Sequence, residues 1–97
     1  MPTPVKRREN TSKVGSSFSD AVIAAVWSKG EVDPRYSAAV YRKDVYGSWV
    51  KRENYGTLGQ YGWEVDHIKP VAAGGTDELS NLQPLYWENN RRKGDSY

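Results

Sequence analysis

The chain of 97 residues contains no cysteine, only one histidine and no long apolar run. Without cysteine it can form neither disulfide bonds nor a thiolate zinc site, the two common ways of stabilising a small protein. No segment approaches the roughly 18 consecutive apolar residues of a membrane-spanning helix, and the basic N-terminus lacks the apolar stretch of a secretory signal. These absences predict a soluble, cytoplasmic protein without a membrane partner.

What the chain does contain is aromatic bulk and an uneven distribution of charge. Four tryptophans and seven tyrosines supply large side chains for the small core of a single domain. The formal net charge is +2, but residues 1–14 carry +3, residues 42–62 carry +2 and residues 63–79 carry −3. An acidic centre between basic flanks suits a site that holds a metal cation and faces a polyanion, although solvated faces of an ordinary domain give the same pattern.

Composition and periodicity divide the chain into an arm and a domain. Residues 1–16 are polar and aperiodic, which predicts a disordered basic arm, with the folded domain spanning 17–97. Ser19 can cap a helix whose apolar residues recur at helical spacing and which ends at a left-handed Gly30. The stretch RYSAAVYRKD fits either a short helix or an irregular crossing, and VYGSWV predicts a short strand.

The C-terminal third predicts a strand, a loop, a second strand and a helix. The first strand is GWEVDHI, the loop is AAGGTDE, the second strand is LSNLQPLY, and the helix is WENNRRKG, closed by Gly94. Together with the N-terminal helix, these elements predict a small single domain of the α+β class.

Four polar residues of that third stand in a distinctive order. Asp66 and His67 end the first strand, Asn81 follows 14 positions after the histidine, and Asn90 follows nine positions later. This order resembles that of the HNH endonucleases of the small bacterial and phage type. The surrounding segments DHIKPVAAGG, LSNLQPL and NNRRKGD resemble the same family. The resemblance covers residues 62–95 and implies a C-terminal ββα-metal motif after the N-terminal helix. It also implies a metal-dependent DNA endonuclease that leaves 5′-phosphate and 3′-hydroxyl ends.

The resemblance assigns a role to each of the four residues. A neutral imidazole can accept a proton from water at neutral pH, which makes His67 the expected general base. Asp66 and Asn90 match the family's metal-ligand positions, and a carboxylate with an amide oxygen favours one Mg²⁺ or Mn²⁺ ion over Zn²⁺ or Ni²⁺. Asn81 is expected to hold the loop and orient His67 through hydrogen bonds, with an ordinary Asx turn as the alternative.

The adjacency of Asp66 and His67 poses a geometric problem. Neighbouring residues on a regular strand point to opposite faces, yet both side chains must address one phosphate. We therefore expect the strand to end or twist here, before Pro70 and the loop with Gly74 and Gly75.

Several charged residues complete the expected site. Glu64 shares a strand face with Asp66 and is expected to support the metal site or a basic side chain, or else to be a solvated acid. Six basic residues are candidates for binding DNA phosphates, with solvated surface charges as the alternative: Arg91, Arg92, Lys93, Lys69, Lys51 and Arg52. The aromatic side chains could stack on bases, but core packing is expected for most of them.

Two other functions compete with the endonuclease hypothesis. One is a non-catalytic nucleic-acid-binding module that keeps the ββα fold, and the presence of all four motif residues argues against it. The other is a bacteriocin-like nuclease toxin domain, which would be expected to carry a leader or linker, and none is visible in the sequence. The sequence predicts no particular protein partner.

Overall fold

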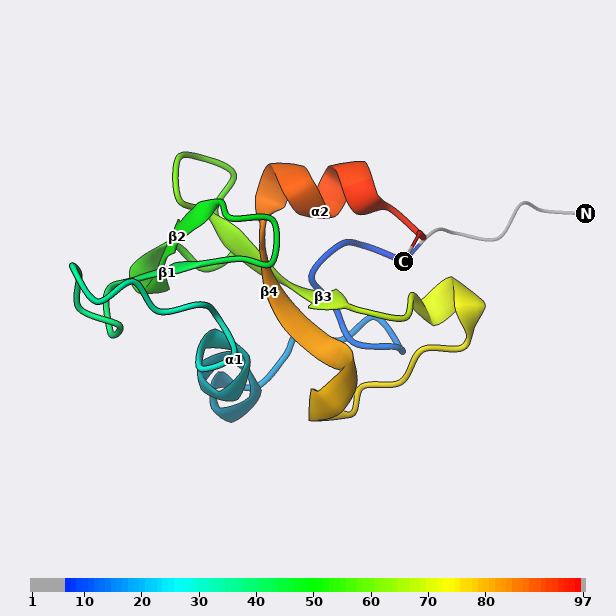
Figure 1. Ribbon diagram of the computed structural model, residues 1–97. Helices are drawn as coiled ribbons and strands as arrows, with labels where there is room; N and C mark the ends of the chain where they lie inside the picture. The colour runs from blue at the N-terminus through cyan, green and yellow to red at the C-terminus, as the bar shows by residue number, and fades with distance from the viewer. Residues whose placement is uncertain (1–6, 97) are drawn as a thin grey trace, which may run out of the picture.

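Two small antiparallel sheets and two short helices make up residues 7–96, the part of the chain that the computed structural model describes (Figure 1). The elements in chain order are α1 (Asp20–Trp27), β1 (Tyr41–Lys43), β2 (Trp49–Lys51), β3 (Trp63–His67), β4 (Leu82–Tyr86) and α2 (Trp87–Lys93). β1 pairs with β2, and β3 pairs with β4. This arrangement agrees with the predicted α+β class. No helix within residues 7–96 is long and apolar enough to cross a membrane.

The sheet of β3 and β4 lies between the two helices, with α1 on one face and α2 on the other (Figure 1). Its register places Trp63 opposite Tyr86 and His67 opposite Leu82. Since both faces are covered, all five residues of β3 are buried, including its charged ones. The alternation of apolar and acidic residues in this strand therefore separates an apolar face under α1 from a polar face under α2.

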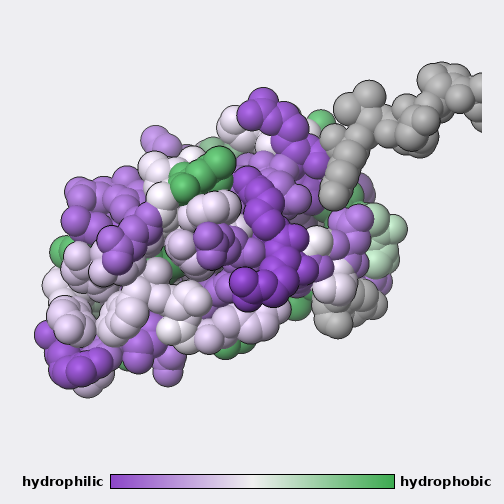
Figure 2. Space-filling model, turned by 90° about the horizontal axis from the view of Figure 1, so that it is seen from above, coloured by the Kyte–Doolittle hydropathy of each residue, from purple (hydrophilic) through white to green (hydrophobic). Residues whose placement is uncertain are grey.

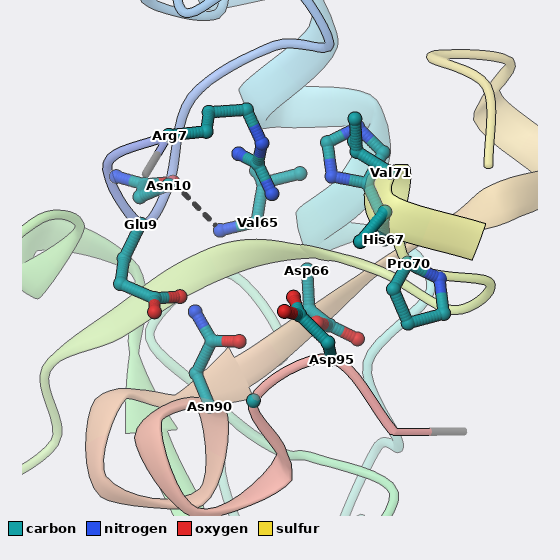
Figure 3. Close-up of a pocket in the computed structure, with 12 residues that line it drawn as sticks. Arg7, Glu9, Asn10, Val65, Asp66, His67, Pro70, Val71, Asn90 and Asp95 are labelled. Carbon is teal, nitrogen blue, oxygen red and sulfur yellow. Dashed lines mark hydrogen bonds between the residues drawn. The ribbon is translucent and has the colours of Figure 1, made fainter. Parts of the chain in front are cut away.

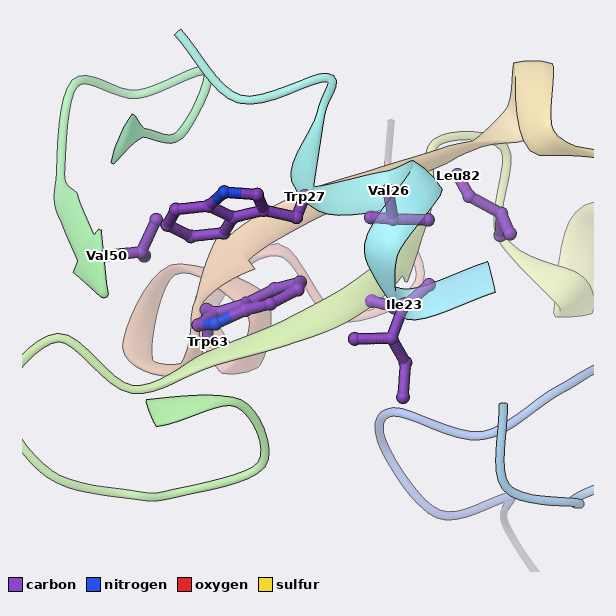
Figure 4. Close-up of a cluster of buried hydrophobic side chains, with 7 residues drawn as sticks. Ile23, Val26, Trp27, Val50, Trp63 and Leu82 are labelled. Carbon is purple, nitrogen blue, oxygen red and sulfur yellow. The ribbon is translucent and has the colours of Figure 1, made fainter. Parts of the chain in front are cut away.

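The apolar core forms between α1 and the α1-facing side of β3 and β4 (Figure 4). Ser19 caps α1 by accepting a hydrogen bond from Val22 N at 3.2 Å. The Trp27 and Trp63 rings meet with centroids 5.3 Å apart. The buried cluster consists of Ile23, Val26, Trp27, Val50, Trp63, Val65 and Leu82. Each such side chain contributes about 1.5–3 kcal/mol on burial, so this cluster fixes the position of β3.

The N-terminal half differs from the sequence prediction in several places. The strand predicted over VYGSWV is a turn up to Ser48, and strand β2 begins only at Trp49. Helix α1 ends at Trp27 with Ser28 as its C-cap, and Gly30 does not adopt the left-handed conformation that we expected. A side chain at Gly30 would instead crowd Arg42, because an added Cβ would lie 3.0 Å from the Arg42 Cβ. The segment left open between helix and irregular crossing is irregular up to β1.

A buried carboxylate joins the two sheets. Asp44 is 2% exposed and lies in the turn between β1 and β2. Its Oδ1 accepts hydrogen bonds from Tyr46 N at 3.0 Å and Ser48 N at 2.9 Å. Its Oδ2 accepts from Tyr86 N at 3.0 Å and Asn89 Nδ2 at 2.9 Å. Asp44 thus fastens the β1–β2 turn to the point where β4 passes into α2.

The prediction of a disordered arm over residues 1–16 is wrong for residues 7–16; residues 1–6 lie outside the described residues. Asn10 Oδ1 accepts hydrogen bonds from Val65 N at 2.8 Å and from Tyr55 Oη at 2.9 Å. Lys13 N donates to Asp77 Oδ1 at 2.9 Å. The physical reason is that Val65 N faces away from β4 and requires an acceptor, which this polar segment supplies.

Candidate active site

A cavity of about 230 Å³ lies beside the C-terminal end of β3 (Figure 3). Asp66 and His67 line it from β3, and Asn90 lines it from α2. Asp95, just after α2, and Glu9, in the N-terminal segment, add two further carboxylates to the wall. The fold therefore brings three of the four predicted motif residues to one cavity, and Asn81 is not among its lining residues.

Asp66 and His67 both belong to strand β3, where they pair with Gln83 and Leu82, so their side chains leave opposite faces of the strand. Strand β3 stops at His67, and the chain then turns through Pro70 into a short 3-10 helix, Val71–Ala73, that lines the same cavity. The turn requires Gly75, because an added Cβ there would lie 1.8 Å from Lys69 O. Both side chains nevertheless line the cavity at the end of the strand.

The imidazole of His67 is buried and held from one side by a carboxylate. It is 3% exposed, its Nε2 lies 2.7 Å from Asp77 Oδ1, and the Phe18 ring packs with its centroid 6.0 Å away. Nδ1 has no hydrogen-bond partner among residues 7–96. When Nε2 carries the proton and donates it to Asp77, Nδ1 has the free lone pair.

Asp77 is held in its ionised form. Partial desolvation raises the pKa of Asp77, but the hydrogen bonds from His67 and from Lys13 N outweigh it, so the net effect lowers the pKa. The side chain is 40% exposed, so solvent also supports its charge. Our sequence analysis did not identify Asp77, which follows the Gly74-Gly75 loop and carries no motif of its own.

Asn81 acts on the loop rather than directly on His67. Its Oδ1 accepts from Lys69 N at 2.8 Å, and its Nδ2 donates to Lys69 O at 3.1 Å and Thr76 O at 2.9 Å. Within the described residues its side chain makes no hydrogen bond to His67. Asn81 closes the loop that leads to Asp77, and Asp77, not Asn81, contacts the imidazole.

The carboxylate of Asp66 is buried between two donors. It is 6% exposed, its Oδ2 accepts from Gln83 Nε2 at 2.9 Å, and its Oδ1 lies 3.3 Å from Lys93 Nζ. Burial raises the pKa of Asp66, while the hydrogen bond from Gln83 and the charge of Lys93 act against that rise. Lys93 Nζ also donates to His67 O at 2.9 Å.

The amide of Asn90 is oriented by a neighbouring carboxylate. Asn90 Nδ2 donates to Glu64 Oε1 at 2.9 Å, and both residues are buried. Arg91 fixes Glu64 in turn, with Nη1 2.6 Å from Oε1 and Nη2 3.0 Å from Oε2. The amide oxygen of Asn90 is thereby directed to the side of Asp66 and Asp95 (Figure 3). Glu64 is not the solvated acid of the alternative prediction, since it supports both this amide and a basic side chain.

The comparison with protein families agrees with this geometry. Residues 51–96 match the family model described as HNH endonuclease. Residues 51–96 are therefore similar to HNH endonucleases. The matched segment includes β3, β4, α2 and all four predicted motif residues. No curated protein and no solved structure matches the chain.

The basic residues predicted to bind DNA differ in how far they are exposed. The side chain of Lys93 is 5% exposed, so the prediction that it grips DNA is wrong: α2 crosses β3 and turns this residue toward Asp66. Arg91 donates hydrogen bonds to Glu64 through both terminal nitrogens, while its side chain remains 38% exposed. Arg92 and Lys69 are exposed, and the face that carries α2 is mainly hydrophilic (Figure 2). Two further candidates, Lys51 and Arg52, do not line the cavity.

The cavity offers two oxygen donors to a metal ion. No group of three or more His, Cys, Asp or Glu residues is arranged to hold a metal within residues 7–96. The side chains of Asp66 and Asn90 instead offer one carboxylate and one amide oxygen to the same cavity. Such a sparse, all-oxygen set fits a hard ion such as Mg²⁺ or Mn²⁺, which keeps several sites for water and phosphate.

Proposed function

We propose that this chain is a metal-dependent DNA endonuclease in which His67 is the general base and Asp66 and Asn90 bind one divalent cation. One observation carries the proposal: a buried imidazole with an ionised carboxylate behind it shares a cavity with two oriented oxygen donors. Phosphodiester hydrolysis needs a base for the attacking water and a means of stabilising charge on the phosphate, and this cavity supplies candidates for both.

His67 would take the proton of the attacking water through Nδ1. Asp77 accepts the hydrogen bond from Nε2 at 2.7 Å and so fixes the tautomer that leaves Nδ1 unprotonated. The same carboxylate stabilises the imidazolium that forms as the proton arrives. Lys13 N and the loop closed by Asn81 keep Asp77 in place, so they contribute to catalysis through the position of the imidazole.

Asp66 and Asn90 would hold the cation through oxygen atoms. Glu64 keeps the Asn90 amide from rotating, because Nδ2 would lose its hydrogen bond if the amide turned over. Gln83 and Lys93 keep the Asp66 carboxylate in a fixed position while offsetting the cost of its burial. A bound ion of this kind stabilises charge on a phosphate oxygen and on the departing 3′ oxygen.

The substrate is proposed to be DNA bound through its phosphates. Arg92 and Lys69 are exposed basic residues close in sequence to Asn90 and His67, and we propose that they contact phosphates beside the cleaved bond. Lys51 and Arg52 would contribute to binding farther from the cut. The two exposed residues should set the salt dependence of binding, because each phosphate contact releases counterions.

The proposal is tested with supercoiled plasmid DNA and purified protein. Nicked or linear DNA should form with Mg²⁺ or Mn²⁺ and not in excess chelator. Asp66→Asn should abolish cleavage and weaken Mn²⁺ binding measured directly by calorimetry, because a neutral amide replaces the carboxylate ligand. Glu88→Gln is the matched control, since it neutralises an exposed acid on α2 outside the cavity. Robust cleavage in excess chelator would contradict metal dependence.

A further inference from the structure

A second cavity, of about 180 Å³, is lined only by aromatic side chains among the described residues. These are Tyr36, Tyr41, Trp49 and Tyr61. The cavity belongs to the β1–β2 sheet, at the opposite end of the molecule from the loop that follows His67 (Figure 1). None of the four belongs to the buried apolar cluster, and three of them precede the segment that matches the HNH family. Their function is therefore not explained by the core or by the nuclease site.

The four rings meet edge to face rather than stacking on one another. Tyr36 and Trp49 have centroids 5.2 Å apart at 81°, and Tyr41 and Tyr61 have centroids 5.6 Å apart at 82°. Edge-to-face packing supports the cluster without closing pairs of ring faces against each other. The hydroxyls of the three tyrosines make no hydrogen bond to any described residue. The cavity is thus lined by aromatic rings, and the hydroxyls of its three tyrosines are without a hydrogen-bond partner among the described residues.

The backbone at Tyr61 is held in an unusual conformation. Its φ is 65°, in the left-handed region that bulky residues seldom adopt. Tyr61 O accepts a hydrogen bond from Lys51 N at 3.1 Å, which fixes this residue to β2. Glycine or asparagine would be the ordinary choice for this backbone. A tyrosine here is consistent with a requirement for its ring, since strained positions cluster at ligand sites.

The charges around the cavity select the kind of ligand. Lys43 Nζ lies 4.8 Å from the Trp49 centroid, and Lys51 Nζ lies 5.7 Å from the Tyr41 centroid. Both lysines also lie against carboxylates, with Lys43 Nζ 3.5 Å from Asp33 Oδ2 and Lys51 Nζ 2.8 Å from Glu53 Oε1. Because the cations are the groups placed over the rings, a cationic ligand is disfavoured there, and an anion attached to an aromatic group could replace these carboxylates as the partner of the lysines. The volume is below the roughly 300–1,000 Å³ of sites for drug-sized ligands, which suits a single planar ring system.

We propose that this aromatic cavity binds one unpaired base of a single-stranded nucleic-acid segment, with Lys43 and Lys51 contacting the adjoining phosphates. A base has a planar face for stacking, polar edges for the tyrosine hydroxyls and an anionic backbone for the lysines. The choice of nucleic acid rests on the proposed nuclease function. The cavity would hold a strand at a distance from the cut, which favours substrates that carry a single-stranded region.

The test is the affinity of the full chain for a labelled oligothymidylate, measured by fluorescence anisotropy in chelator so that no cleavage occurs. Tyr61→Asn removes the ring while keeping a residue that tolerates the left-handed backbone. Tyr36→Ala removes a second ring from an exposed position. Each should weaken binding by about tenfold, the usual effect of losing one stacked base. Tyr46→Ala is the matched control, because Tyr46 is exposed but does not line the cavity.

An abasic oligonucleotide of the same length separates stacking from charge. The wild type should bind it more weakly than oligothymidylate, and the two variants should bind it as the wild type does. The proposal is wrong if Tyr61→Asn and Tyr36→Ala bind oligothymidylate like the wild type, or if they lose affinity equally for the abasic strand. It is also wrong if free thymidine monophosphate binds as tightly as the oligonucleotide. Plasmid cleavage is measured separately. Base-dependent binding without cleavage would contradict the proposed nuclease function but support the proposed base-binding cavity.

Discussion

Replacing Asp77 by asparagine tests the contact that orients the proposed base. The substitution keeps the size of the side chain but removes the charge that faces His67 Nε2 at 2.7 Å. An amide can present either its oxygen or its nitrogen to the ring, so the tautomer with a free Nδ1 is no longer enforced. Cleavage should therefore slow while metal and DNA binding persist, because neither proposed ligand nor any exposed basic residue is altered.

The size of the effect follows from the exposure of the carboxylate. A hydrogen bond to a charged group contributes about 1.5–3 kcal/mol. Asp77 is 40% exposed, and solvent screening places the expected loss at the lower end. A loss of about 1–2 kcal/mol in transition-state stabilisation corresponds to about a 5–30-fold lower rate. This is far below the roughly 10⁴-fold loss when the buried orienting aspartate of a Ser-His-Asp triad is replaced.

The assay is the single-turnover cleavage rate of a labelled DNA duplex at saturating metal. Glu78→Gln is the matched control, since it neutralises the neighbouring exposed acid, which makes no side-chain contact with His67. The control should cleave at the wild-type rate. If Asp77→Asn also cleaves at that rate, the carboxylate does not orient the base and the reasoning is refuted.

Three further substitutions test other parts of the structure. Asn90→Ala should raise the metal concentration needed for half-maximal cleavage while unfolding stays cooperative, and an unchanged metal titration would remove Asn90 from the ligand set. Asp44→Ala leaves four hydrogen-bond donors without their acceptor, and each buried unpaired donor costs about 1–3 kcal/mol. Chemical denaturation should therefore show a free energy of unfolding lower by at least about 3 kcal/mol. A decrease below about 1 kcal/mol would mean that water replaces the carboxylate. Asn10→Ala should increase hydrogen exchange at the Val65 amide, which donates to Asn10, and unchanged protection would show that the N-terminal segment does not dock there.

The elements near the motif could be predicted because local signals agree there. The strand that ends at His67 has its apolar pattern and the stop at Pro70, and the last helix has Gly94, whose φ is 53° at its C-terminal end. The same signals predict that the adjacent residues Asp66 and His67 lie at a strand end and that Asn90 lies on the helix. These features depend on residues close together in sequence, where propensity and pattern decide the structure.

The contacts that orient the site could not be predicted, because they join segments distant in sequence. Asn10 meets Val65 across 55 positions, and nothing in a polar arm identifies Asn10 as the acceptor for the Val65 amide. Asp77 meets His67 only after the loop closes on itself. Lys93 is turned inward because β3 is covered on both faces, which its alternating pattern does not reveal. For each of these polar side chains, the sequence is equally compatible with a position exposed to solvent.

The most direct test of the central claim is the single-turnover rate of wild-type and His67→Ala protein across pH at saturating Mg²⁺. The wild-type protein should cleave DNA at a rate that depends on His67 as the proton acceptor. His67→Ala should lose about 10²–10⁴-fold in rate, the usual contribution of a positioned base, while Mn²⁺ and DNA affinities stay close to those of the wild type. Cleavage by His67→Ala at the wild-type rate at every pH would contradict the account and leave the domain as a nuclease without this base.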